Sequence, residues 1–358
     1  MLCPGETENQ KYLYPAAVGC RYFKYSGYFN RKARKPMKNV REIPFNAIPN
    51  VKIGHAQDSE NGTGCTVLIF KDKAPCGLDV RGGGPASRET QLLNPTASND
   101  GVHAVLLSGG SAYGLDAAGG VMKYLEERGI GFPVGDVVVP IVVGSCIFDL
   151  GCGSPRVRPD AEMGYAACVN SEKNENPQGN VGAGMGATVG KLLGPGRTMK
   201  SGLGTYGVQL GDLQVGAVVA VNAIGDVYAL DSQKELAGLL SEDGSSMISS
   251  EEAALALMQQ AAGFVSNTTI AAIVTNATLS KSQMKKVAQL SSNGMARTIR
   301  PVNTSMDGDT VYALSCGTVS ASGDVVGTLG AYALGMAINR AVTEAEDRFG
   351  YPSAKHFL

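Results

Sequence analysis

Short apolar segments of five to seven residues recur along the chain, each bounded by turn residues. They occupy residues 66–70, 102–107, 137–143, 216–221 and 268–274. Segments this short predict buried strands rather than helices. Helix-like sequences cover residues 112–128, 249–262, 280–294 and 329–348, two of them opened by capping boxes at Ser249 and Ser280. Because no constant βαβ period or repeat joins them, we expect an α/β fold, layered with helices outside the sheets.

The composition limits the partners and the compartment. Hydrophobic residues make up 44% of the 358, enough for one large core. Lys plus Arg number 31 and Asp plus Glu 32, so the broad basic field of a nucleic-acid-binding protein is missing. Eight cysteines are scattered without a C-x-x-C pair, which favours reduced thiols in a cytoplasmic protein. No uninterrupted apolar stretch approaches the ~18 residues of a membrane span, so we expect no membrane partner.

Residues 1–36 form a separate segment. They are rich in Tyr, Lys and Arg and contain no apolar core of a secretion signal. Met37 opens a sequence that looks like an ordinary start. We therefore expect 1–36 to be a disordered or mis-annotated extension and 37–358 to be a single domain. Whether translation starts at Met1 or Met37 stays open.

The usual catalytic motifs are weak. The chain has three histidines, His55, His103 and His356, and neither H-E-x-x-H nor G-x-S-x-G occurs. Residues 182–187 fit the dinucleotide pattern only formally, since no strand precedes them and no acidic residue follows at the expected distance. We therefore expect no metal and no cofactor.

A threonine at a free chain start can act without a histidine. Its own α-amine, with an ordinary pKa of about 7.7–8.0, serves as base for its own hydroxyl. An internal threonine can use this chemistry only after the preceding peptide bond breaks. The residues alone do not select one, because Asn267-Thr268 and Asn303-Thr304 are the same dipeptide.

Residues 267–276, Asn-Thr-Thr-Ile-Ala-Ala-Ile-Val-Thr-Asn, select the first pair by resemblance. They are similar to the start of the small subunit in the DmpA-type L-aminopeptidase/D-esterase family, which includes β-peptidyl aminopeptidases and the nylon-oligomer endo-hydrolase. The similarity runs from about Ile43 to the final helix. It implies an αββα-type sandwich, shared with ornithine acetyltransferases. It also implies self-cleavage between Asn267 and Thr268 into an α chain (to 267) and a β chain (268–358), assembled as a homotetramer of αβ units.

The same resemblance assigns further catalytic residues. Lys191 follows Gly-Ala-Gly-Met at 182–185, Asn222 ends a strand, and Asp307 and Asp309 lie in Met-Asp-Gly-Asp-Thr. Thr268 would attack the carbonyl, and the Asn222 amide would donate to the oxyanion. The two aspartates would hold Thr268 and the charged terminus, while Lys191 would lower the pKa of the Thr268 amine or position the aspartates. Taken singly, each matches a common structural role: a turn for the aspartates and Asn222, a surface position for Lys191.

Gly110, Ser111, Tyr113 and Phe148 are expected to line the substrate pocket. The glycines at 82–84 and 109–110 would let backbone N–H groups approach a substrate, although tight turn packing explains them equally well. Ser111 is also the expected N-cap of the helix at 112–128. Phe148 stands where several family members carry a tyrosine, so the role of that hydroxyl is in doubt here.

The resulting hypothesis is an amidohydrolase or aminopeptidase that cleaves small amides or short peptides through an acyl-enzyme on Thr268. Two alternatives remain open at this point: an acyltransferase of the ornithine acetyltransferase type, and a non-catalytic binding protein on the same fold. The sequence does not distinguish exo from endo cleavage.

Overall fold

Two large sheets dominate the computed structural model, which describes residues 37, 39–257 and 267–358. The six-stranded sheet has the order β1 (Arg41–Ile43), β12 (Leu203–Leu210), β13 (Leu213–Asn222), β18 (Thr268–Ala277), β20 (Thr310–Val319), β4 (Cys76–Val80). The five-stranded sheet has the order β2 (Val51–Asp58), β3 (Thr63–Ala74), β6 (Val102–Ser108), β9 (Val142–Cys146), β5 (Ala86–Arg88). The expected extension at 1–36 lies outside the described residues.

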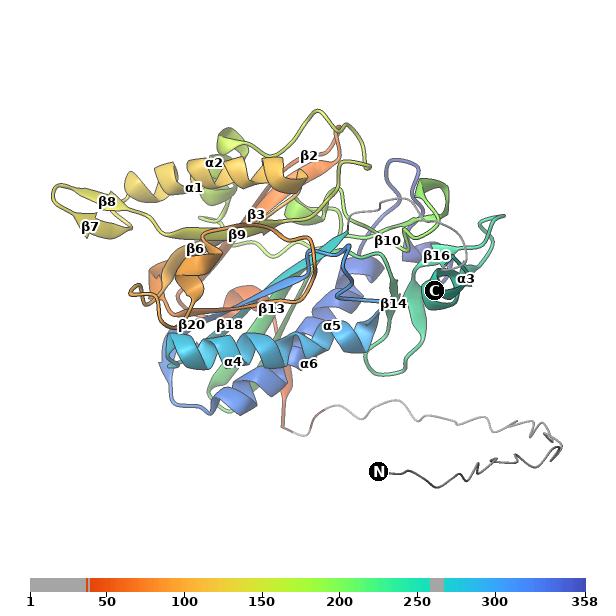
Figure 1. The fold of residues 1–358 in the computed structure, drawn as a ribbon. Coiled ribbons are helices and arrows are strands. Elements are labelled where there is room, and N and C mark those ends of the chain that lie inside the picture. The colour runs from red at the N-terminus through yellow and green to blue at the C-terminus, as the bar shows by residue number, and fades with distance from the viewer. Residues whose placement is uncertain (1–36, 38, 258–266) are drawn as a thin grey trace, which may run out of the picture. The chain divides into compact units, whose positions relative to one another are not determined.

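Helices cover the outer face of each sheet (Figure 1). On the five-stranded sheet lie α1 (Ala117–Glu126) and α2 (Ala161–Asn170). On the six-stranded sheet lie α4 (Lys281–Ser291) and α6 (Gly323–Thr343), and α5 (Asn293–Thr298) packs against α6. The four layers form an αββα sandwich, and the fold expected from the resemblance is confirmed.

Shorter elements connect these layers. The helices among them are α3 (Ser250–Leu257) and 3-10 turns at Phe45–Ala47, Thr90–Leu93, Ser111–Asp116, Gly182–Gly184, Pro195–Arg197 and Ala354–His356. The strands are β7 (Phe132–Val134), β8 (Val137–Val139), β10 (Thr188–Val189), β11 (Met199–Lys200), β14 (Asp226–Tyr228), β15 (Glu235–Ala237), β16 (Leu239–Leu240), β17 (Met247–Ile248) and β19 (Ile299–Arg300).

The central strands are apolar on both faces because both faces are covered. In β13, Val219 packs under the helices of the six-stranded sheet, whereas Val218 and Ala220 pack against the five-stranded sheet. This alternation follows the two-residue period of a strand. Burial on both sides explains why these strands read as continuous apolar runs rather than as alternating ones.

Helix α6 is long and apolar enough to cross a membrane on length and composition alone. It packs instead on β12 and β13, and 67% of its most apolar stretch is buried inside the fold. Its Leu334 and Ile338 belong to the core beneath the six-stranded sheet. It is therefore a core helix of this domain.

Most of the expected elements are confirmed. The apolar segments at 66–70, 102–107, 216–221 and 268–274 lie in β3, β6, β13 and β18. The Ser280 capping box opens α4: Ser280 Oγ accepts the Gln283 N–H, and the Gln283 side chain accepts the Ser280 N–H at 2.8 Å. The helix at 249 begins at Ser250 in α3, and its expected end lies outside the described residues.

Three predictions were wrong in position. The segment 137–143 is not one strand, because Pro140 offers no N–H to a ladder and separates β8 from β9. Ser111 does not cap an α-helix: it has φ 55° and opens a 3-10 turn, and α1 begins at Ala117. The last helix runs over 323–343, because the Ser322 side chain caps it by accepting the Asp324 N–H.

Candidate active site

Strand register brings the ends of three strands together. In the antiparallel pair β13 and β18, Asn222 lies directly opposite Thr268. Strand β20 runs parallel to β18, with Ile270 opposite Thr310, so the loop before β20 reaches the same edge of the sheet. That loop carries Asp307 and Asp309. All five side chains of this cluster are buried, and none is more than 8% exposed: Asn222, Thr268, Asp307, Asp309 and Lys191.

The Asn267–Thr268 bond is held by backbone contacts with the loop before β20. The Asn267 N–H donates to the Met306 carbonyl at 3.1 Å, and the Gly308 N–H donates to the Asn267 carbonyl oxygen at 2.9 Å. The Thr268 hydroxyl donates to this same oxygen. The Asn267 carbonyl oxygen is thus held between the hydroxyl of the next residue and a backbone N–H from the loop before β20.

Gly308 has no room for a side chain. A Cβ at this position would lie 2.7 Å from Thr268 Oγ and 3.0 Å from the Gly84 carbonyl oxygen. Gly82 is equally constrained, since its Cβ would lie 2.3 Å from the Asp307 carbonyl oxygen. Gly82 and Gly84 therefore pack against the loop that contains the aspartates, as the turn-packing alternative expected.

The two aspartates are fixed by backbone donors. Asp309 accepts the Thr269 N–H at 2.6 Å and the Asn303 N–H at 2.9 Å. Asp307 accepts the backbone N–H and the hydroxyl of Thr304 at 2.8 and 2.6 Å. Burial and the neighbouring Asp307 charge raise the pKa of Asp309 to about 7, and burial also raises the pKa of Asp307. The negative charge of Asp307 disfavours ionisation of Asp309, so the two carboxyls do not titrate independently.

Lys191 is buried, so the surface-lysine alternative is wrong. Its Nζ donates to the backbone carbonyl of Asn222 at 3.0 Å. Burial lowers its pKa to about 7, and this effect is opposed by the negative charges of Asp307 and Asp149. The amine can therefore exchange a proton near neutral pH, beside the strand end that faces Thr268.

The Asn222 side chain is oriented by its neighbours. Its Oδ1 accepts the Thr188 N–H at 3.1 Å, and its Nδ2 donates to the Phe148 carbonyl at 2.9 Å. An amide nitrogen carries two protons, so one is left for a substrate oxygen after the bond to Phe148.

A cavity of about 210 Å³ reaches Lys191, the one residue of the cluster in its wall, and is also lined by Phe148, Cys152, Pro195 and Tyr351, among others. Sequence reasoning missed Cys152 and Tyr351, because no local motif marks them. Tyr351 follows the last helix and donates its hydroxyl to the Gly151 carbonyl at 3.0 Å. This wall is assembled by the tertiary fold.

The other expected pocket residues lie elsewhere. The Gly110 N–H donates to Asp149 at 2.6 Å, the Ser111 N–H donates to the Ile147 carbonyl at 2.9 Å, and Tyr113 is 62% exposed under the Arg158 guanidinium. None of the three lines the cavity beside Lys191. Asp149, which sequence reasoning passed over, is buried and also accepts the Thr63 hydroxyl at 2.8 Å. The sequence feature that could have identified Asp149 is its position as a lone carboxylate among the apolar residues at 146–150.

Comparison with known proteins identifies the family. The model of peptidase family S58 matches residues 46–351. The chain belongs to peptidase family S58. An uncharacterized aminopeptidase of Mycobacterium leprae is 40% identical over 299 residues, covering 78% of this chain and 81% of that protein. The 6-aminohexanoate-oligomer endohydrolase of Agromyces sp. is 32% identical over 270 residues, covering 75% and 73%.

Solved structures share the fold of this S58 chain. The L-aminopeptidase D-Ala-esterase/amidase of Ochrobactrum anthropi, described as a variant of the Ntn hydrolase fold, aligns with a TM-score of 0.64 at 17% identity, over 86% of this chain and 88% of its own. A β-aminopeptidase of Burkholderia sp. aligns with a TM-score of 0.60 at 18% identity, over 85% and 88%. The S58 chain is a hydrolase that acts on peptide or amide bonds.

Proposed function

We propose that the chain cleaves itself between Asn267 and Thr268, and that the released Thr268 is the nucleophile of an amidohydrolase or aminopeptidase. The observation that carries this proposal is the position of the Asn267 carbonyl. Its oxygen lies against the Thr268 hydroxyl and accepts the Gly308 N–H at 2.9 Å. A donor aimed at the oxygen that becomes negative is what acyl transfer requires.

Self-cleavage begins when Thr268 Oγ attacks the Asn267 carbonyl carbon. The Gly308 N–H stabilises the oxyanion on the Asn267 oxygen. The bond from the Asn267 carbon to the Thr268 nitrogen then breaks, and that nitrogen takes up the proton released by the hydroxyl. An ester between Asn267 and Thr268 Oγ results. Water hydrolyses it to an Asn267 carboxylate, a free hydroxyl and the new Thr268 amine.

Substrate turnover uses the freed residue. The Thr268 amine accepts the proton of its own hydroxyl, and Oγ attacks the substrate carbonyl carbon. The bond from that carbon to the substrate nitrogen then breaks, the leaving amine takes up the proton held by the Thr268 amine, and an acyl-enzyme remains. The second proton of the Asn222 amide is donated to the oxyanion. Asp307 and Asp309 hold the positively charged Thr268 terminus. The positive charge of the buried Lys191 amine lowers the pKa of the Thr268 amine and so favours the neutral form of that terminus. Water then releases the acyl group.

The proposed substrates are small amides or short peptides. Relatives are named aminopeptidase and 6-aminohexanoate-oligomer endohydrolase, so both exo and endo cleavage are candidate modes for this chain. The cavity beside Lys191, of about 210 Å³, suits a small acyl group. Its wall combines apolar side chains, among them Phe148 and Pro195, with the ionisable side chains of Asp149 and Lys191.

We extend the proposal to the organisation of the protein. Residues 37–358 act as one domain, cut into an α chain ending at 267 and a β chain of 268–358. The αβ units assemble as a homotetramer in the cytoplasm, without a nucleic-acid or membrane partner. The near-zero net charge of −1 supports the absence of a nucleic-acid partner.

Intact-mass spectrometry with amidase assays tests the proposal. We expect two chains with a break at 267/268 in the wild type, one inactive chain in Thr268→Ala, and partial processing in Thr268→Ser, which keeps a hydroxyl. Release of p-nitroaniline from aminoacyl anilides should exceed acetyl transfer to glutamate. Normal processing of Thr268→Ala would refute the cleavage site, and efficient acetyl transfer would favour the acyltransferase alternative.

A further inference from the structure

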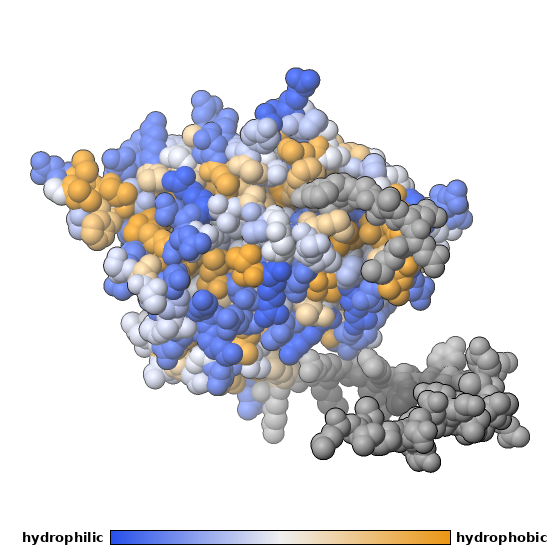
Figure 2. All heavy atoms as spheres, in the orientation of Figure 1, coloured by the Kyte–Doolittle hydropathy of each residue, from blue (hydrophilic) through white to orange (hydrophobic). Residues whose placement is uncertain are grey.

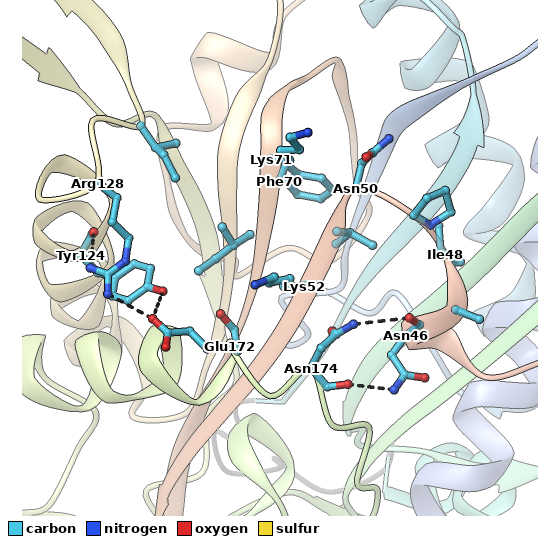
Figure 3. A pocket seen from close by; sticks show the side chains of 16 residues that line it. Asn46, Ile48, Asn50, Lys52, Phe70, Lys71, Tyr124, Arg128, Glu172 and Asn174 are labelled. Carbon is cyan, nitrogen blue, oxygen red and sulfur yellow. Dashed lines mark hydrogen bonds and ion pairs between the residues drawn. The ribbon is translucent and has the colours of Figure 1, made fainter.

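Two surface features stand apart from the catalytic cluster. The β7–β8 hairpin exposes apolar side chains, which Figure 2 shows gathered on a projecting arm. An open cavity of about 790 Å³ is lined by Lys52, Lys71 and Tyr124, among others (Figure 3). Neither feature contains a residue of the cluster. A buried side chain in the interior does connect to it, that of Lys200 at the end of β11.

Lys200 places its ammonium group among backbone carbonyls. The side chain is fully buried and forms no ion pair with any residue that the structure describes. Its Nζ donates to the carbonyl oxygens of Ser201, Ala187 and Gly184 at 2.6, 2.8 and 3.3 Å. An ammonium carries three protons, so these three acceptors use all of them. Burial lowers the pKa of Lys200 to about 8, which leaves the charged form in the majority at pH 7.

One of these carbonyls belongs to the peptide group that holds Asn222. The peptide between Ala187 and Thr188 is a rigid plane, with the Ala187 oxygen on one side and the Thr188 N–H on the other. The oxygen accepts from Lys200 at 2.8 Å, and the N–H donates to Asn222 Oδ1 at 3.1 Å. Strand pairing supports the same arrangement, since Thr188 lies opposite Lys200 in the ladder of β10 and β11. A single peptide group therefore separates the Lys200 charge from the Asn222 amide.

This chain of hydrogen bonds acts on the proton that meets the oxyanion. A positive charge at the Ala187 oxygen polarises the Thr188 N–H, and this N–H in turn draws electron density toward Asn222 Oδ1. The two Nδ2 protons of the same amide become stronger donors. One of them is bound to the Phe148 carbonyl at 2.9 Å, and the other is left for the substrate oxygen.

We propose that Lys200 is a positioning residue for substrate turnover, which orients and polarises the Asn222 amide through the peptide between Ala187 and Thr188. The inference rests on the proposed role of Asn222 as the oxyanion donor. It assigns Lys200 to the turnover step and not to self-cleavage, because the oxyanion of self-cleavage is bound by the Gly308 N–H.

The first experiment measures kcat and KM of Lys200→Met for aminoacyl p-nitroanilides, per mole of β chain with a free Thr268 terminus. Methionine keeps an unbranched apolar side chain and removes the charge. We expect kcat to fall by about 10-fold, a part of the loss that removal of an oxyanion donor causes. KM should stay unchanged, because the contact strengthens only when the oxyanion forms.

The half-time of self-cleavage separates positioning from a general fold defect. Lys200→Met should cut itself at the wild-type rate, since that reaction uses a different oxyanion donor. Equal slowing of self-cleavage and turnover would assign Lys200 to the stability of the fold and overturn the inference. A wild-type kcat in Lys200→Met would overturn it as well.

Lys281→Met is the matched control. The Lys281 Nζ also donates to backbone carbonyls, those of Ala97 and Asn99 at 3.0 and 2.7 Å, but it extends from α4 and contacts no part of the 184–188 segment. This variant should keep the wild-type kcat. A loss as large as that of Lys200→Met would show that the effect is not specific to the path through Thr188.

A double-mutant cycle tests whether Lys200 acts through Asn222. In an Asn222→Ala background Lys200→Met should cost no further kcat, because the group it orients is gone. Losses that add would overturn the inference and leave the proposed role of Asn222 intact. A wild-type kcat in Asn222→Ala alone would overturn that role too, so the two failures are distinguishable.

Discussion

Replacing Gly308 by alanine should slow self-cleavage while leaving the fold in place. The added Cβ would lie 2.7 Å from Thr268 Oγ, closer than Cβ contacts in real proteins. The Thr268 side chain must therefore shift away from the Asn267 carbonyl. A displacement approaching 1 Å at reacting atoms can cost about 100-fold, so we expect cleavage to slow by about 10- to 100-fold, or about 1.4–2.7 kcal/mol of activation free energy.

The matched control is Gly84→Ala. Gly84 packs on the same loop, but its Cβ would meet no atom closer than the Asp307 carbonyl oxygen at 3.8 Å. This variant should cleave at the wild-type rate. Cell-free synthesis with a short labelled pulse, followed by denaturing gels over time, gives the half-time of the uncut chain for each variant.

To separate a fold defect from a local effect, the melting temperature of the Gly308→Ala/Thr268→Ala double variant is compared with that of Thr268→Ala, since neither protein can cut itself. Thr268→Ala removes the hydroxyl that Gly308→Ala would strike, so the double variant should melt close to Thr268→Ala alone. If Gly308→Ala cleaves as fast as wild type, Thr268 Oγ does not act from the position seen here, and the reasoning fails.

Three further predictions concern the buried groups. Asn222→Ala should lower the kcat for aminoacyl p-nitroanilides by about 10²–10³-fold. It should also destabilise the protein by about 1–3 kcal/mol for each partner left unsatisfied, Thr188 N–H and Phe148 C=O, as measured by urea unfolding. Lys191 has a folded pKa of about 7 against an ordinary 10.5, so the unfolded chain binds more protons above pH 7. The free energy of unfolding of the uncut Thr268→Ala protein should therefore rise between pH 7 and the ordinary cysteine pKa of about 8.5, and Lys191→Met should flatten that rise. Asp309→Asn should lower kcat/KM, since an amide has one acceptor oxygen where the carboxylate accepts from both Thr269 and Asn303; an unchanged kcat/KM would remove Asp309 from the site.

Local sequence determined the elements that depend on neighbours in the chain. The run at 268–274 is a strand wherever it lies in the fold, because it is short, apolar and rich in β-branched residues. The Ser280 cap needs only Gln283, three residues away. The Asn267-Thr268 pair and the Asp307/Asp309 spacing were likewise visible in the sequence, through resemblance to a family that the comparisons confirm.

Local apolarity could not assign strands to sheets. Residues 137–143 look uniformly buried, yet Val137 is 55% exposed in the hairpin while Val143 lies in the core between the sheets. Burial depends on what packs against a strand, and that partner is distant in sequence. For the same reason Ser111, Gly110 and Tyr113 looked like pocket residues but lie outside the cavity beside Lys191.

The sequence by itself therefore determined the types of element, the family and the candidate cleavage bond. Tertiary structure alone decided that Asn222 lies opposite Thr268, that Lys191 is buried beside them, and that the Gly308 N–H meets the Asn267 carbonyl. These contacts depend on the register between β13, β18 and β20. Register is set when the apolar faces of whole strands pack into the sandwich, and no short segment contains that information.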